Sequence, residues 1–251
     1  RNFIFRSREF SQMEMEFFIK PEKAIQEEWY GYWKKARYQW YIDLGIKESG
    51  LHMRDHDKDE LAHYASGCVD VEYDFPFGRS ELEGIADRGN YDLSQHIKFS
   101  KKDLSYFDAE NSEKFVPAVI ETSAGCDRTL LTVLCDAYSE DEVGGEKRTV
   151  MRFAPHIAPI KLAVLPLSKK LAEPAKKLEK DLRQVFKTEY DDAGSIGKRY
   201  RRQDEIGTPF CMTFDFESEQ DQSVTIRHRD SMQQDRVAIA SVNEYLRDKG
   251  L

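Results

Sequence analysis

The order of strand-like and helix-like segments changes near residue 158, and this change constrains the fold more than any other feature of the sequence. Before it, several short strand-like segments follow one another, whereas after it strands and helices alternate. A run of strands flanked by helices is typical of an antiparallel α+β domain, and alternation is typical of an α/β domain. We therefore expect two domains, 1–150 and 158–251, with a connector bounded by Pro155 and Pro159.

The first half predicts one long helix and several strands. Apolar residues recur at three- and four-residue intervals from Pro21 to Leu44, which predicts an amphipathic helix. The segment 3–18 is rich in aromatic residues and alternates apolar with polar residues from Gln12 onward, as a strand with one apolar face does. Further strands are expected at 68–73, 80–86 and 115–121, and a helix around 130–137.

The second half predicts alternating strands and helices. The expected strands are 160–167, 210–216 and 224–227, and the expected helices are 171–186, 197–203 and 232–246. The charged stretch 140–148, which ends before the boundary between the two halves, is expected to be a loop.

Composition excludes several classes of protein. The formal net charge of −8 argues against a protein that coats nucleic acid, so any RNA contact must be local. No run approaches the roughly 18 apolar residues of a membrane span, and the N-terminus lacks a signal-peptide layout, so we expect a cytoplasmic protein without a membrane partner. The four cysteines form no CxxC pair and the histidines show no zinc-ligand spacing, so neither disulfides nor structural zinc are expected.

Two groups of acidic residues leave two explanations open. Gln12, Glu14 and Glu16 project to one side of their strand, because side chains two apart share a face. A solvent-facing polar edge is the usual explanation for such a pattern, and a carboxylate-lined pocket is the alternative. Glu81 and Glu83 pose the same question, since they are also two residues apart on a predicted strand.

The segment 119–128 combines a strand, a turn of small residues and the start of a helix. Small residues let a ligand approach the backbone, and a helix N-terminus favours phosphate. Arg128, near the start of this helix, could pair with phosphate or stack on a base. The spacing alone does not separate a nucleotide site from an ordinary turn. Ser123 has no His and acid partner nearby in the sequence, so a hydrolase triad is not expected.

A basic run lies in the second half, where Lys198, Arg199, Arg201 and Arg202 surround Tyr200. Such a run is usually a solvated helix face. Basic residues interleaved with an aromatic residue also suit an RNA backbone and a stacked base. The pattern leaves both explanations open.

Taken in order, these segments resemble the dimeric, bacterial-type glycyl-tRNA synthetases, a class II aminoacyl-tRNA synthetase family. The matching segments are 1–18 (loop and second strand of motif 2), 81–93 (the ELEGIADR…YDL string), 121–128 (motif 3), and 158–161, 194–209 and 224–230 (C-terminal domain). The resemblance implies part of a class II catalytic domain, an α+β antiparallel sheet flanked by helices. It also implies an α/β anticodon-binding domain with a mixed sheet.

The family's activity gives the acidic residues a role. Glycyl-tRNA synthetases are glycine–tRNA ligases, which activate glycine with ATP to glycyl-adenylate and transfer glycine to tRNA(Gly). By resemblance, Glu14 and Glu121 would pair with the glycine ammonium group, and Ser123 would shape the pocket. Arg88 would face the substrate carboxylate or order the acidic residues. Such a pocket excludes alanine sterically, which rejects a larger competitor more sharply than affinity rewards a smaller one.

The resemblance also implies an ATP site. Arg128 would contact ATP phosphate, Glu81 would help to hold the Mg²⁺ bound to ATP, and Phe10 would be a platform for adenine. Arg128 and Glu81 would thus serve catalysis by positioning and charge neutralisation, without a covalent enzyme intermediate. The basic run formed by Lys198, Arg199, Arg201 and Arg202 would contact tRNA.

Two family elements have no counterpart in the sequence. Motif 1, which builds the dimer interface, and the FRxE arginine that opens motif 2 would both precede residue 1. We therefore expect the chain to be the downstream part of a longer, homodimeric enzyme and to be inactive alone. The alternative is a non-catalytic tRNA-binding or accessory protein of the same fold, which would not need Glu14, Glu81, Glu121, Ser123 and Arg128.

Overall fold

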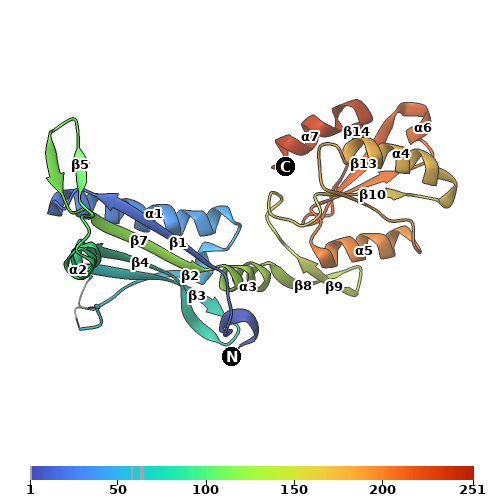
Figure 1. Ribbon diagram of the computed structural model, residues 1–251. Coiled ribbons are helices and arrows are strands. Elements are labelled where there is room, and N and C mark those ends of the chain that lie inside the picture. The colour runs from blue at the N-terminus through green and yellow to red at the C-terminus, as the bar shows by residue number, and fades with distance from the viewer. Residues whose placement is uncertain (1, 58, 63–64) are drawn as a thin grey trace. The chain divides into compact units, whose positions relative to one another are not determined.

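The computed structural model describes residues 2–57, 59–62 and 65–251. The chain separates into two compact units, Arg1–Cys135 and Asp136–Leu251 (Figure 1). The boundary between the two units along the chain therefore lies upstream of the connector that we expected near residue 155.

The stretch expected to be a loop at 140–148 is an antiparallel hairpin that opens the second unit, so this prediction was wrong. Its strands are β8 (Tyr138–Val143) and β9 (Glu146–Met151). Gly144 and Gly145 form the turn with φ angles of 62° and 80°, the left-handed backbone that a two-residue hairpin turn requires.

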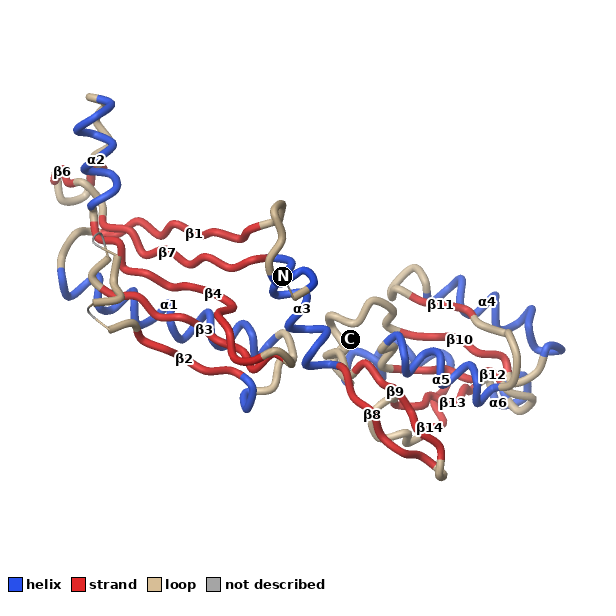
Figure 2. The backbone as a smooth tube through the Cα atoms, turned by 90° about the horizontal axis from the view of Figure 1, so that it is seen from below, coloured by secondary structure: helices blue, strands red, loops and turns tan. Residues whose placement is uncertain are grey.

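The first unit is built on a five-stranded antiparallel sheet with the strand order β1-β7-β4-β3-β2 (Figure 2). Its strands are β1 (Gln12–Ile19), β2 (Leu51–Asp55), β3 (Gly67–Phe75), β4 (Gly78–Gly89) and β7 (Ala118–Gly125). The antiparallel sheet expected for this half is therefore confirmed. The first strand begins later than we expected, because Asn2 and Phe3 have positive φ angles and the segment Phe3–Phe5 is a short 3-10 helix.

One face of this sheet is covered by the long helix α1 (Lys23–Asp43), as the apolar spacing predicted. The core between them contains fully buried Tyr41, Val71 and Ile85, with tryptophans of α1 packed around it. Helix α1 has 21 residues and is long enough to cross a bilayer, but it is too polar to do so. Among the described residues no helix combines the length and the apolar character of a membrane span.

Between β4 and β7 the first unit contains elements that we did not predict from the sequence. Helix α2 (Tyr91–Ser100) follows β4, and a small hairpin of β5 (Tyr106–Asp108) and β6 (Glu113–Phe115) follows α2. The strand expected at 115–121 is split at Pro117, which has no N–H to donate to a sheet.

The chain leaves the sheet through helix α3 (Cys126–Ala137), which follows β7 without a loop. Leu131, Val133 and Cys135 of this helix pack against the core of the first unit. The helix expected from the apolar spacing at 130–137 is therefore present and begins one turn earlier.

The second unit contains a mixed sheet with the strand order β11-β10-β12-β13-β14. Its strands are β10 (Leu162–Pro166), β11 (Thr188–Tyr190), β12 (Phe210–Phe214), β13 (Ser223–His228) and β14 (Gln234–Ala238). Strand β10 is parallel to β11 and β12, and the remaining pairs are antiparallel. The expected mixed sheet is confirmed.

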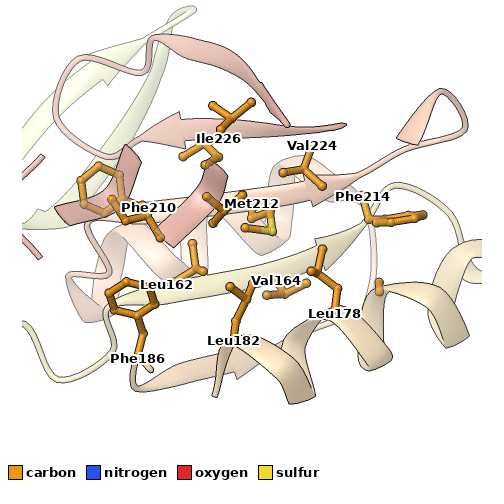
Figure 3. Packing of buried hydrophobic residues seen from close by; sticks show 14 of the residues in the cluster. Leu162, Val164, Leu178, Leu182, Phe186, Phe210, Met212, Phe214, Val224 and Ile226 are labelled. Atoms are coloured by element: carbon orange, nitrogen blue, oxygen red, sulfur yellow. The ribbon is translucent and has the colours of Figure 1, made fainter. Parts of the chain in front are cut away.

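Helices pack on this sheet and enclose an apolar core (Figure 3). The helices are α4 (Ala172–Leu182), α5 (Ile196–Ile206), α6 (Ser218–Asp221) and α7 (Val242–Asp248). Figure 3 shows Leu178 and Leu182 of α4 directed toward Val164 and Met212 of the sheet.

The single helix expected at 232–246 was wrong in its first half. Strand β14 pairs with β13 over this stretch. A short 3-10 helix at Ile239–Ser241 then leads into α7. Met232 has a φ angle of 58°, which turns the chain back toward the sheet and is incompatible with a helix. Apolar residues such as Val237 therefore belong to an edge strand, which a short stretch of sequence does not distinguish from a helix.

Candidate active site

The sheet of the first unit has a polar face opposite α1. The register of β1 and β7 places Glu14 across from Ser123 and Glu16 across from Glu121. Because side chains alternate along a strand, these four side chains point to the same side. Residues of the opposite parity, such as Ile120, pack toward α1. The fold therefore gathers the acidic residues that the sequence singled out on one face.

A chain of hydrogen bonds links the first group on this face. Gln12 donates from Nε2 to Ser123 Oγ at 2.5 Å and to Glu14 Oε1 at 3.1 Å. The Ser123 hydroxyl donates to Glu14 Oε1 at 3.5 Å. Gln12 was recognised as sharing this face but was not predicted as a site residue. Its amide fixes the Ser123 hydroxyl and the Glu14 carboxylate relative to each other.

The second group contains Glu121 and Arg88. Arg88 donates from Nη1 to Glu121 Oε2 at 2.5 Å, and both side chains are largely shielded from solvent. This geometry supports one of the two roles expected for Arg88, which is to order the acidic residues.

Negative charge accumulates on this face. The pKa of Glu16 is raised above its usual value, first by partial burial and then by the negative charge of Glu121, while Arg88 opposes the shift. Glu14 adds to the repulsion. A cationic group placed between these carboxylates would relieve it, so the polar face is suited to bind an ammonium ion.

A cavity of about 200 Å³ adjoins this face. Ser123 lines it together with Phe5, Phe10, Glu81 and Arg128. The three residues predicted for an ATP site, Phe10, Glu81 and Arg128, therefore share one cavity. Ser123 lies at the junction, because it also belongs to the hydrogen-bonded group on the polar face.

Arg128 is held in place within this cavity. Its Nη1 donates to the backbone carbonyl of Glu81 at 2.9 Å and lies 3.6 Å from Glu81 Oε1. The guanidinium lies 4.6 Å from the centroid of the Phe5 ring, in a cation–π arrangement. Phe5 was not among the predicted site residues, because its segment was interpreted as a strand leading into β1.

The start of α3 is fastened to the segment before β1. Cys126 donates from its backbone N–H to Ser11 O at 2.8 Å, and the Ser11 N–H donates to Asp127 Oδ2 at 3.2 Å. Asp127 also lines the cavity and was not predicted. Its place in the first turn of a helix after a small-residue turn is the signal that could have identified it.

Glu81 and Glu83 do not share a role. A β-bulge pairs Val71 with Glu83 and Glu72 with Glu81, which sends the two carboxylates to different environments. Glu83 is fully buried and accepts hydrogen bonds from the guanidinium of Arg37 at 2.6 and 3.1 Å. Glu83 therefore anchors α1 to the sheet, while Glu81 remains at the cavity.

The fold also brings together His56, Cys68 and Asp70, whose potential ligand atoms lie within 4.8 Å of one another. This group was not predicted, because His56 follows β2 while Cys68 and Asp70 lie on β3. Arg54 places Nη2 3.0 Å from Asp70 Oδ2 and 3.3 Å from His56 Nε2. This guanidinium already supplies positive charge to the cluster, so we interpret it as an ion-pair network.

The basic run of the second unit is divided by burial. Arg199 is only 3% exposed and donates to the backbone carbonyls of Pro166, Asp192 and Gly194. It holds a loop together, so its prediction as a tRNA contact is corrected.

The other three members of the run remain accessible. Lys198 is exposed, and Arg201 and Arg202 are half-buried. Arg202 forms an ion pair with Asp191 at 2.5 Å. These three residues stay candidates for contact with an anionic partner.

Comparison with known proteins identifies relatives along nearly the whole chain. Residues 161–249 match the family described as "Anticodon binding domain". The chain is 54% identical over 248 residues to the glycine–tRNA ligase of Caldanaerobacter subterraneus subsp. tengcongensis, which covers 99% of this chain and 53% of that protein. It is 56% identical over 249 residues to the glycine–tRNA ligase of Ruminiclostridium cellulolyticum, covering 99% of this chain and 54% of that protein.

The glycine–tRNA ligase of Thermobifida fusca is 55% identical over 258 residues, covering 99% of this chain and 55% of that protein. The chain spans about half the length of the relatives that it matches. The sequence identity to these relatives confirms the resemblance that the motifs indicated.

Proposed function

We propose that this chain forms the glycine pocket, part of the ATP site and the anticodon-binding part of a glycine–tRNA ligase. The enzyme would activate glycine with ATP and transfer it to tRNA(Gly). One observation carries the proposal. The acidic group around Glu14 and the cavity around Arg128 meet at Ser123, as binding sites for an amino acid and for ATP must if the two substrates are to react.

The acidic face would recognise the glycine ammonium group. Glu14 and Glu121 would accept its hydrogen bonds, and the Ser123 hydroxyl would complete the set. Charge-assisted hydrogen bonds of this kind are stronger than neutral ones. Arg88, already bonded to Glu121, would keep that carboxylate oriented, which limits the loss of entropy when glycine binds.

The cavity residues suit the parts of ATP. The Arg128 guanidinium matches a phosphate oxygen pair, and the rings of Phe5 and Phe10 offer apolar faces to a base. The carboxylates of Glu81 and Asp127 line the same cavity and are the hard oxygen ligands that Mg²⁺ prefers. When bound, the ion would neutralise phosphate charge.

The proposed reaction has two steps. A carboxylate oxygen of glycine attacks the α-phosphorus of ATP, forming glycyl-adenylate as pyrophosphate leaves. A ribose hydroxyl at the 3′ end of tRNA(Gly) then attacks the glycine carbonyl carbon, and AMP leaves. The residues of this chain would position the substrates and neutralise charge, without a covalent enzyme intermediate.

The second unit would bind the anticodon arm of tRNA(Gly), with Lys198, Arg201 and Arg202 as candidate phosphate contacts. We place the enzyme in the cytoplasm as a homodimer, in line with the class to which its relatives belong.

Glycine-dependent exchange of pyrophosphate into ATP tests the proposal. It should be measured on this chain and on the longest form of the protein that contains it, with alanine replacing glycine as the control. We expect exchange with glycine, not with alanine, in the longer form. Absence of exchange in both forms, together with intact tRNA binding, would instead support the non-catalytic accessory protein.

A further inference from the structure

Asp92 contacts the proposed glycine pocket through Arg88. Its Oδ2 accepts a hydrogen bond from Arg88 Nε at 2.7 Å, while Arg88 Nη1 donates to Glu121 Oε2 at 2.5 Å. One guanidinium thus joins two carboxylates from different elements, since Asp92 lies in the first turn of α2 and Glu121 lies on β7. None of the roles described above requires Asp92.

The backbone at Arg88 explains why its side chain needs such an anchor. In the pairing of β4 with β7, Asp87 lies across from Ile120 and Gly89 lies across from Val119, so Arg88 is an extra residue in a β-bulge. A bulge changes the direction in which the side chain of the extra residue points. The orientation of the guanidinium therefore depends on what its nitrogen atoms contact.

Asp92 is well placed to serve as this contact. A carboxylate in the first turn of a helix is favoured by the helix dipole. The hydrogen bond to Asp92 is the largest cause that raises the pKa of Arg88, ahead of the charge of Glu121. Two contacts at Nε and Nη1 fix the plane of the guanidinium, because the group is planar and its donors have fixed directions.

We infer that Asp92 is a positioning residue for glycine, which acts through Arg88 to hold the Glu121 carboxylate in the orientation that receives the ammonium group. This inference rests on the proposed function and deepens it. Glu121 accepts one bond from Arg88, and a carboxylate can accept about four, so capacity remains for an ammonium donor.

The test uses Asp92→Ala and Asp92→Glu in the longest form of the protein, with pyrophosphate exchange as the assay. We expect Asp92→Ala to raise the KM for glycine about 10-fold, while kcat and the KM for ATP change less than about 2-fold, because ground-state binding of one substrate is affected. Asp92→Glu keeps the charge and should restore part of the glycine affinity.

Asp103→Asn is the matched control. Asp103 is an acidic residue of the same region, but it pairs with Lys114 and not with Arg88. Asp103→Asn should leave the KM for glycine unchanged. An unchanged KM in Asp92→Ala, or equal increases of the KM for glycine and for ATP, would overturn the inference and leave the proposed function standing. If the unsubstituted protein shows no glycine-dependent exchange, the proposed function fails and the inference fails with it.

Discussion

On the polar face of the first sheet, Glu14, Glu16 and Glu121 lie together, and Arg88 is the cation that bonds to Glu121. In the second unit, by contrast, Asp204 is fully buried between two arginines. It accepts two bonds from Arg227 at 2.9 and 3.0 Å and lies 3.3 Å from Arg148 Nη1. The first group has surplus negative charge near a cavity, whereas the carboxylate of the second group is compensated by cations of the protein and is closed to solvent.

This difference distinguishes charged groups that stabilise the fold from charged groups that are available to bind a ligand. Burying a carboxylate is costly unless cations and hydrogen bonds compensate it, and Asp204 has such compensation within the protein. The acidic face has less, as the raised pKa of Glu16 indicates. The predictions below therefore assign stability to one group and substrate binding to the other.

Removing Asp204 should have the largest effect. In Asp204→Ala, Arg227 becomes a buried cation without the carboxylate that it bonds, while Arg148 keeps its pair with Asp141. The second unit should therefore lose about 3 kcal/mol of unfolding free energy. Urea unfolding followed by circular dichroism measures this. Tryptophan fluorescence provides an internal reference, because all three tryptophans lie in the first unit.

The neighbouring Glu205 is exposed, so Glu205→Ala should change stability by less than about 0.5 kcal/mol. Equal stability of Asp204→Ala and Glu205→Ala would show that the buried network contributes nothing to the fold.

Glu121→Ala should impair substrate binding, whereas Asp204→Ala should impair stability. We expect kcat/KM for glycine activation to fall by about 100-fold or more, because a charge-assisted contact to the ammonium group is lost and Arg88 loses its bond to Glu121. Affinity for tRNA should stay nearly unchanged, since the anticodon-binding match lies in the second unit. Pyrophosphate exchange and a filter-binding assay measure the two quantities. A parallel loss of both would indicate misfolding instead of a lost substrate contact.

Glu16 gives the comparison a pH dependence. Its pKa is raised in the folded protein, so it favours folding below its unfolded value of about 4.5, and this contribution disappears as the pH rises through the raised value. Glu16→Gln should therefore stabilise the protein near pH 7, by at most about 0.5 kcal/mol because the side chain is exposed to solvent, and have no such effect near pH 4. Thermal unfolding across this pH range measures it, and destabilisation at pH 7 would contradict surplus negative charge on this face.

The two regions also differ in what the sequence could predict. Glu14, Ser123 and Arg128 were identified because strand alternation and a recognisable family string place them in short, continuous segments. Long-range charge networks are different, since the partners of Arg148 lie up to 81 residues away. A charged stretch of sequence therefore suggested a loop where the structure has a hairpin.

Short elements on the surface escaped prediction for a related reason. Helix α2 has 10 residues, none of them buried, whereas α1 was recognised from apolar residues that recur over 21 residues. Asp92 could not be linked to Arg88 without knowing that this helix begins directly after a bulge in β4. Most strands of both sheets were predicted from the sequence, but β2, β11 and β14 were not. The contacts that orient the site residues depend on the tertiary fold.

The smallest expected effect concerns two adjacent residues of the basic run. Lys198 is exposed and Arg199 is buried, so Lys198→Ala should weaken tRNA binding about 2- to 3-fold and reduce the salt dependence of binding by about one phosphate contact, without changing stability. Arg199→Ala should instead lower the stability of the second unit, because three carbonyls lose their donor. Binding titrations at several salt concentrations, with urea unfolding of both variants, measure the contrast. If Lys198→Ala left both the affinity and its salt dependence unchanged, this helix face would be an ordinary solvated surface, and the anionic partner would have to be bound elsewhere on the second unit.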